Sequence, residues 1–252
     1  EKGWATLTGI GGNLQQVTER SFGVPDAVNS GQTGIGIVID FFAFSAKASG
    51  FPVSFSYPSI TTVVPANVGI IANAPNPKGA EAFVNYLLSE KGQAILLEPA
   101  IRRLPINPAL YKDAPEGFPN PFEDPRFQSM ITFDSDVSKQ RTDVVDALYD
   151  QLITFQLDSL RDATKAIQAA EKALASNDQA EARALIAEAH GLISKMPVTA
   201  DEAASDEMRA AFTGGEEKTA RQAELEQAWA AFAGEKYAAA KTKAEQALDL
   251  ID

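Results

Sequence analysis

Few side chains in this sequence could carry out catalysis. His190 is the single histidine, and it lies inside an amphipathic helical pattern, where a lone histidine is usually a surface residue. There are no cysteines, which excludes disulfides, thiolate metal ligands and cysteine nucleophiles. The glycines of the segment 9–13 follow a helical pattern and precede no clear helix, so they do not match a nucleotide-binding phosphate loop. We therefore expect no enzyme, no metal site and no cofactor.

A second group of side chains could bind a ligand without reacting with it. Asp40, Phe41 and Phe42 directly follow the β-branched run 35–39, at the start of a predicted helix. Backbone N–H groups in the first turn of a helix can bind an anion, and aromatic rings there can stack on an organic ligand. The alternative is that one or both rings pack in the core. The candidate ligand-binding residues, each at the end of a predicted element, are Asn13, Asp40, Phe41, Phe42, Ser59 and Thr61.

Proline divides the chain into two regions that must fold differently. Thirteen of the 14 prolines lie in residues 1–125, and proline is excluded from the interior of long helices. In this region, runs typical of strands alternate with short helical patterns, which favours a largely parallel, helix-covered sheet and thus an α/β fold. The predicted strands are 35–39, 53–57, 61–64 and 68–71, and the predicted helices are 1–10, 25–30, 41–48, 77–88 and 91–97. We expect the run 35–39 to be a central strand that is buried on both faces.

The remaining residues are predicted to be helical almost throughout. Helical patterns cover residues 137–175, 179–195, 201–212, 221–233 and 236–251. The segment 170–175 recurs in similar form as 228–233, which resembles the helical hairpin of tetratricopeptide repeats. This pattern predicts a helical bundle or a pair of stacked hairpins. The rings of Trp229 and Phe232 either fill the core between helices or form an exposed stripe that meets a partner.

The charge of the chain bears on its partners. A formal net charge of −12 argues against nucleic acid, because a phosphate-binding face needs clustered lysines and arginines. An acidic protein is also repelled by anionic lipid surfaces. No apolar run approaches the ~20 residues that a membrane-spanning helix needs. The simplest interpretation is that the acidic surface keeps the protein in solution.

Several segments between residues 24 and 93 resemble a known family in order and spacing. They are residues 28–32, 34–42, 57–58, 72–77 and 83–93. Together they resemble class II periplasmic solute-binding proteins of ABC importers, in the branch that takes ferric ions, sugar phosphates, phosphonates or phosphoglycerate. Ferric-binding members carry two adjacent tyrosines where this sequence has Phe41 and Phe42. Because phenylalanine has no donor atom, we expect no Fe³⁺ ligation at this position.

The resemblance implies a domain organisation. Residues 1–128 are expected to be the later part of an α/β solute-binding lobe. The chain is then expected to begin inside the domain, with the N-terminal lobe missing. Residues 129–252 are expected to form an all-helical extension, either a bundle or stacked hairpins.

The resemblance also implies a function. We expect a periplasmic protein that captures a small organic anion, phosphorylated ones included, by closing two lobes over it. It would deliver this ligand to an inner-membrane ABC permease. The alternative is a ligand-sensing regulatory or scaffold protein whose helical extension contacts a membrane sensor or another partner. Self-association through that extension belongs to the same alternative.

Overall fold

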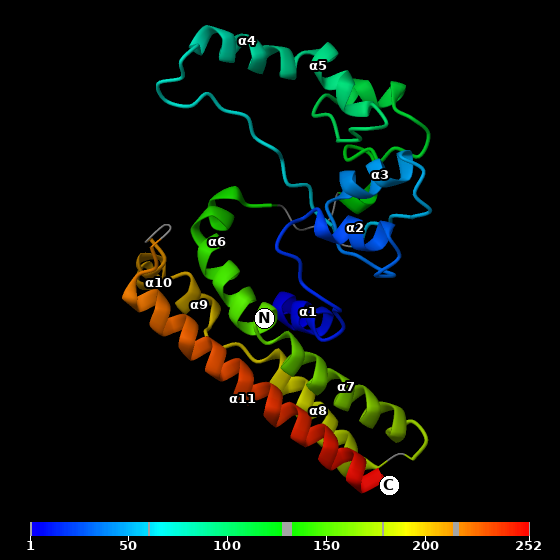
Figure 1. Ribbon diagram of the computed structural model, residues 1–252, viewed down its shortest axis with the longest axis vertical. Coiled ribbons are helices and arrows are strands. Elements are labelled where there is room, and N and C mark those ends of the chain that lie inside the picture. The colour runs from blue at the N-terminus through cyan, green and yellow to red at the C-terminus, as the bar shows by residue number, and fades with distance from the viewer. Residues whose placement is uncertain (1, 60, 128–132, 178, 214–216, 252) are drawn as a thin grey trace. The chain divides into compact units, whose positions relative to one another are not determined.

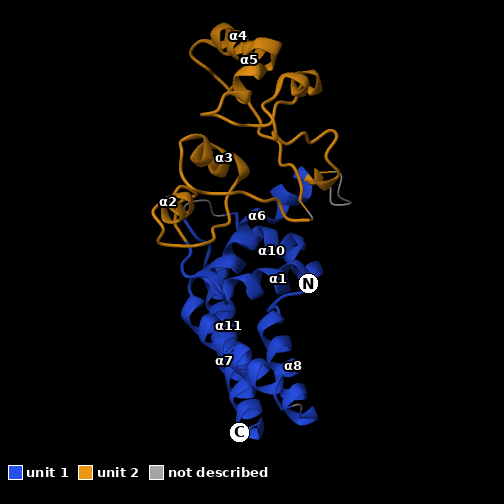
Figure 2. Ribbon diagram, turned by 90° about the vertical axis from the view of Figure 1, so that its right-hand side faces the viewer, with its two compact units in different colours: residues 1–17, 135–252 blue, residues 18–134 orange. Residues whose placement is uncertain are grey.

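The computed structural model describes residues 2–59, 61–127, 133–177, 179–213 and 217–251, and it divides into two compact units (Figure 2). The first consists of Glu1–Val17 and Ser135–Asp252, and we call it the bundle unit. The second, Thr18–Asp134, is the inserted unit, because the chain enters and leaves it between two parts of the bundle unit. The predicted boundary after residue 128 falls among residues 128–132, which lie outside the described residues, so it stays a prediction.

The bundle unit is built around α7 (Leu157–Leu174), α8 (Ala180–Ser194) and α11 (Ala220–Ile251), with α11 packed along both other helices (Figure 1). Its remaining elements are α1 (Lys2–Gly11), α6 (Ser135–Tyr149), the π-helix η4 (Asp150–Thr154), α9 (Ala200–Ala203) and α10 (Asp206–Ala211). In the part of the chain that the structure describes, no helix is both long enough and apolar enough to cross a membrane. The helical prediction for the region after residue 129 is confirmed for its described residues.

Small side chains allow the three main helices to approach closely. Fully buried alanines on their facing sides are Ala163, Ala170, Ala182, Ala189, Ala233, Ala240, Ala244 and Ala247. Larger apolar side chains fill the space between them, Leu160 and Ile167 among the most deeply buried. Trp229 belongs to this core, since it is 3% exposed and stacks on Phe212 with 5.9 Å between ring centroids. Of the two alternatives for Trp229, the structure therefore shows the packed one.

The prediction of two helices between residues 221 and 251 is wrong. α11 is one helix of 32 residues, and Gly234 lies inside it. The segment 170–175 lies at the end of α7, where the chain turns into α8, whereas the similar segment 228–233 lies inside the continuous α11. A glycine in a helix interior costs only about 1 kcal/mol relative to alanine. Burial of Ala233 and Tyr237 on either side of Gly234 outweighs that cost.

The predicted helix 137–175 is also interrupted. The π-helix η4 separates α6 from α7, and Leu152 and Ile153 within it are fully buried. The hydroxyl of Tyr237 on α11 donates to the carbonyl oxygen of Leu152 at 2.8 Å. Burial raises the pKa of Tyr237, so the phenol stays protonated and keeps this donor. This hydrogen bond from α11 thus stabilises the π-helical turn η4, whose turns are wider than those of an α-helix.

The first helix packs by a face that the sequence pattern did not predict. The apolar residues Trp4, Leu7 and Ile10 share one face by their spacing, and Trp4 packs against the core of the bundle unit. Leu7 and Ile10 are exposed, however, whereas Thr8 and Gly11 are buried. Because Gly11 has no side chain, the C-terminal end of α1 lies directly on α7 and η4.

The inserted unit contains short helices joined by irregular chain. Its elements are α2 (Gly23–Asn29), α3 (Asp40–Ala48), α4 (Pro77–Leu88), α5 (Glu90–Ala94) and the 3-10 helices η1 (Ile95–Leu97), η2 (Pro108–Asp113) and η3 (Pro125–Phe127). The Asn76 side chain caps α4, since it accepts from the Gly79 N–H at 3.0 Å. Gly31 and Gly50, which follow α2 and α3, have φ of 76° and 88°, as glycines beyond a helix end often do.

The predicted α/β fold is wrong: the described residues contain no strand, and the fold is all-helical. All the segments predicted as strands are irregular, and Ile35, Ile37 and Ile39 are 86%, 67% and 55% exposed. β-branched residues favour a strand only where neighbouring strands supply packing and hydrogen bonds. The run 35–39 instead lies on α2 through Gly36, where any larger side chain would press on that helix.

Candidate ligand-binding site

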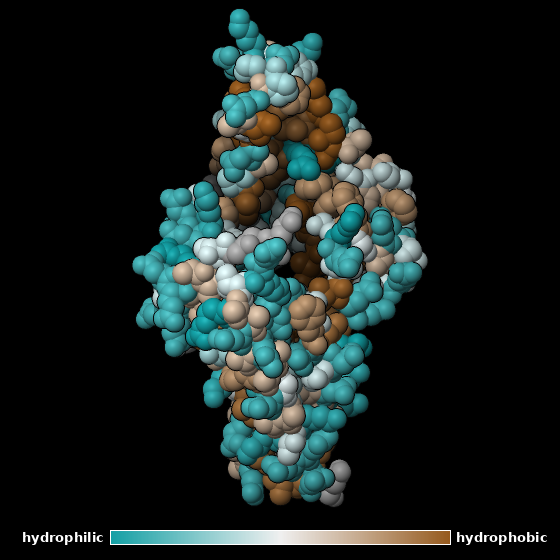
Figure 3. Space-filling view, turned by 60° about the vertical axis from the view of Figure 1, so that its left-hand side comes forward, coloured by the Kyte–Doolittle hydropathy of each residue, from teal (hydrophilic) through white to brown (hydrophobic). Residues whose placement is uncertain are grey.

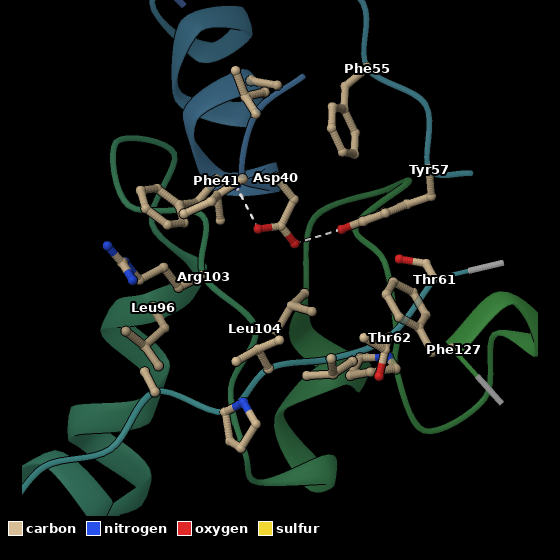
Figure 4. Close-up of a pocket in the computed structure, with 18 of the residues that line it drawn as sticks. Asp40, Phe41, Phe55, Tyr57, Thr61, Thr62, Leu96, Arg103, Leu104 and Phe127 are labelled. Carbon is tan, nitrogen blue, oxygen red and sulfur yellow. Dashed lines mark hydrogen bonds between the residues drawn. The ribbon is translucent and has the colours of Figure 1, made fainter. Parts of the chain in front are cut away.

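The inserted unit contains a cavity of about 1740 Å³, larger than the roughly 300–1,000 Å³ of most small-molecule sites. Segments from α2, the start of α3 and residues 53–58, 61–68 and 103–106 line it, several of them drawn in Figure 4. Most lining side chains are apolar, and apolar surface gathers on the inserted unit in the face drawn in Figure 3. Among the described lining residues, Arg103 is the single cationic side chain and Asp40 the single carboxylate.

Asp40 stands at the start of α3 with both carboxylate oxygens engaged. One oxygen accepts from the backbone N–H of Phe41 at 2.7 Å, and the other accepts from the Tyr57 hydroxyl at 2.8 Å (Figure 4). Burial, and then the hydrogen bond to Asp40, raise the pKa of Tyr57. The phenol therefore remains a donor throughout the physiological pH range, and it orients the carboxylate.

Arg103 lies against the ring of Phe41. The guanidinium carbon is 3.7 Å from the ring centroid, well inside the ~6 Å range of cation–π contacts. The backbone N–H of Arg103 donates to the carbonyl oxygen of Leu96 at 3.0 Å, which ties this segment to η1. No carboxylate or other acceptor bonds the guanidinium among the described residues. Its N–H donors are therefore available to a ligand.

A second arginine near the cavity is already neutralised. Arg126 lies over the ring of Tyr57, with its guanidinium carbon 5.4 Å from the centroid, and donates through Nε to Asp124 at 3.0 Å. The hydrogen bond from Arg126 holds the pKa of Asp124 below its usual range. The ring of Phe127 packs edge-on to Tyr57 at 4.9 Å. Arg126 and Phe127 thus pack against Tyr57. Arg103 remains the cation that a ligand can contact.

The structure brings three of the six predicted site residues to the cavity. These three are Asp40, Phe41 and Thr61. Phe42 does not line the cavity, and its ring packs against that of Phe41 with 4.4 Å between the centroids. Ser59 is exposed and does not line the cavity. Ligand binding by any of these residues stays a prediction.

Asn13, the sixth predicted residue, belongs to the bundle unit. Its side-chain amide donates to the carbonyl oxygen of Gly9 at 2.9 Å, and its oxygen accepts from Gln168 at 3.0 Å. These bonds hold the end of α1 against α7. The structure thus gives Asn13 a role in helix packing.

Sequence reasoning missed Arg103 and Tyr57. Arg103 follows Arg102 in an irregular segment, and two adjacent cations outside any helical face were the available signal. Tyr57 ends the segment 53–57, whose alternating apolar residues predict a strand, and Phe55 in it was the other aromatic signal. Neither pattern identifies a partner, because Asp40 and Phe41 lie far away in the chain.

Comparison with known proteins links this region to solute binding. Residues 12–94 match the family model described as bacterial extracellular solute-binding protein. The matched segment includes Asp40, Phe41 and Tyr57, whereas Arg103 lies outside it. No solved structure matches the chain.

Two curated relatives are similar to a larger part of the chain. They are the phosphoglycerate transport regulatory proteins PgtC of Salmonella typhimurium and Salmonella typhi, each 32% identical over 198 residues. The alignments cover 79% of this chain but 46% of each relative, so the chain spans about half the length of the curated relatives it matches. The family match therefore supports a bacterial solute-binding protein, and residues 12–94 are the segment that carries this similarity.

Proposed function

We propose that this chain is part of an extracytoplasmic solute-binding protein that captures a small organic anion and does no chemistry on it. One observation carries the proposal: the segment matched by the solute-binding family supplies Asp40 and Phe41 to a cavity whose single described cation, Arg103, has no acidic partner. A cation without a partner is the group that an anionic ligand would neutralise.

The chemistry of the cavity favours an organic anion with a compact acidic group. A guanidinium presents planar N–H donors that suit a phosphate or carboxylate, and stacking on Phe41 holds its plane in one orientation. The apolar lining around it suits a short carbon skeleton. The relatives named for phosphoglycerate transport make a phosphorylated three-carbon acid the first ligand to test.

Several parts of the proposal concern the whole protein. They are closure of two lobes over the ligand, delivery to an inner-membrane ABC permease, and a periplasmic location. The description of the matched family as extracellular supports the location. We also propose that the position of Phe41 and Phe42 does not bind Fe³⁺, because neither ring carries a donor atom.

A second candidate function is a ligand-sensing regulator. The curated relatives are named as regulatory proteins of phosphoglycerate transport, and this name favours a protein partner. Ligand capture by the inserted unit is common to both functions. Under the second one, the bundle unit would contact a membrane sensor.

Isothermal titration calorimetry of the chain with 3-phosphoglycerate tests the proposal. We expect binding by the unmodified chain and at least a tenfold loss of affinity in Arg103→Gln, because a hydrogen-bonded ion pair to the ligand disappears. Arg20→Gln is the matched control, since Arg20 is an exposed arginine of the inserted unit that does not line the cavity. Equal affinities for the two variants would contradict the assignment of Arg103, and absence of binding in every variant would contradict the proposed function.

A further inference from the structure

The two charged side chains of the cavity are held apart. Arg103 and Asp40 both line it, yet no ion pair joins them or links either to another described residue. Arg103 is exposed and Asp40 is half-buried, so solvent screens the attraction between the two charges. Each has a partner of its own instead: the Phe41 ring for Arg103, and the Tyr57 hydroxyl for Asp40 (Figure 4).

Asp40 retains the capacity to accept further hydrogen bonds. Each oxygen of an ionised carboxylate can accept about two hydrogen bonds, and Asp40 uses one site on each oxygen, for the Phe41 N–H and the Tyr57 O–H. These two bonds also fix the plane of the carboxylate. The cavity therefore presents an oriented acceptor that carries negative charge.

Arg103 presents the complementary group. Its guanidinium is covered on one face by Phe41, and a guanidinium directs its N–H donors within its own plane. An anionic group of a ligand can bond those donors without displacing any acceptor of the described chain. The cavity thus offers a free cationic donor and a separate anionic acceptor.

We propose that Asp40 is the specificity-determining residue of this cavity and that it selects anions carrying a hydroxyl group. This inference rests on the proposed function. The acidic group of the ligand bonds Arg103, and a ligand hydroxyl donates to Asp40. A second acidic group at the same place would meet the negative charge of Asp40 and be repelled, while an alkyl group would leave the carboxylate without a donor. Tyr57 is the positioning residue that orients Asp40.

Calorimetry with a matched pair of phosphates tests this selection. Glycerol 3-phosphate and propyl phosphate share the phosphate and the three-carbon chain, but propyl phosphate lacks both hydroxyls. We expect the unmodified chain to bind glycerol 3-phosphate at least tenfold more tightly, because a hydrogen bond to a charged acceptor is lost with the alkyl compound. In Asp40→Asn this ratio should fall severalfold toward one, and the affinity for propyl phosphate should not fall, because the variant removes a negative charge and no hydrogen bond to this ligand.

Control variants separate this inference from the proposed function. Asp113→Asn removes the same charge from an exposed site that does not line the cavity, and its ratio should equal that of the unmodified chain. If both phosphates bind equally well and Arg103→Gln weakens both, anion capture stands and the hydroxyl selection by Asp40 is overturned. An unchanged ratio in Asp40→Asn overturns it as well. If neither phosphate nor 3-phosphoglycerate binds the unmodified chain, the proposed function itself fails.

Discussion

The bundle unit and the inserted unit bury their apolar side chains to very different extents. In the bundle unit Leu152, Ile153 and Leu160 are fully buried, whereas in the inserted unit Ile35 and Ile71 are 86% and 74% exposed. A helix satisfies its own backbone hydrogen bonds and needs only one apolar stripe covered. An extended run needs a neighbouring chain for its backbone. The period of the apolar residues, more than their number, therefore determines whether a unit buries these side chains in a core of its own.

The tryptophans make the comparison measurable. The sequence contains two, and both Trp4 and Trp229 lie in the bundle unit. Tryptophan fluorescence therefore follows unfolding of the bundle unit, while far-ultraviolet circular dichroism follows the helices of both units.

The largest effect is expected from Leu152→Ala. Removing a fully buried leucine leaves a cavity in the core, which should lower the free energy of unfolding by about 2–5 kcal/mol. Ile35→Ala is the matched change in the inserted unit and should alter it by no more than ~0.5 kcal/mol, because Ile35 is largely exposed. Urea titrations followed by both optical signals measure the two values. A comparable loss for Ile35→Ala would mean that this side chain is buried after all.

A pH dependence is expected from Lys236, a lysine of α11 that is 4% exposed. Its ammonium group donates to the carbonyl oxygens of Ile193 and Lys195 at 2.9 and 2.8 Å, at the C-terminal end of α8. Burial lowers the pKa of Lys236 from 10.5 to about 8. Between these values the unfolded state binds more protons than the folded one, so the free energy of unfolding should rise with pH, by at most roughly 3 kcal/mol.

Fluorescence-detected urea titrations from about pH 7 to about pH 11.5 check this expectation, because this range extends about one unit beyond each of the two pKa values. Lys236→Met should remove the rise, because no titrating group remains at that position. Lys241→Met, a change at a half-exposed lysine on the same helix, should retain it. A flat profile in the unmodified chain would show that the amine of Lys236 keeps an ordinary pKa.

A smaller loss is expected from Gly12→Ala, at the end of α1. A Cβ atom at this position would collide with the side chain of Thr164 on α7, and relief of such overpacking costs about 1–3 kcal/mol. Gly9→Ala, inside α1, meets no neighbouring atom and should instead stabilise slightly. Thermal unfolding followed by fluorescence compares the two variants. If both behave alike, α1 does not pack on α7 in this way.

The smallest effect is a gain, expected from Gly234→Ala. The added methyl group would meet only Gln156, at 3.9 Å, which is ordinary contact. Alanine in a helix interior is favoured over glycine by about 0.5–1 kcal/mol, so the free energy of unfolding should rise by that amount. The same urea titration measures it. A loss of stability would indicate that the chain bends at Gly234 and that α11 is two helices.

Local signals in the sequence determined much of the helical structure. Asn76 before Pro77 specified the start of α4, because a side-chain acceptor and a fixed φ act within one turn. The repeating apolar positions of residues 157–194 specified α7 and α8 and their buried faces. The sequence also placed Asp40 and Phe41 at the start of a helix. Each of these outcomes depends on residues a few positions apart.

Only the tertiary structure decided which distant segments meet. It left Ile35 to Ile39 without a neighbouring strand, although their residue types favour one. It kept α11 straight through Gly234, because burial along the helix outweighs the cost of one glycine. It also brought Tyr57 to Asp40 and Arg103 to Phe41. Such contacts depend on how the whole chain packs, and the residue types near each position in the sequence do not specify their partners.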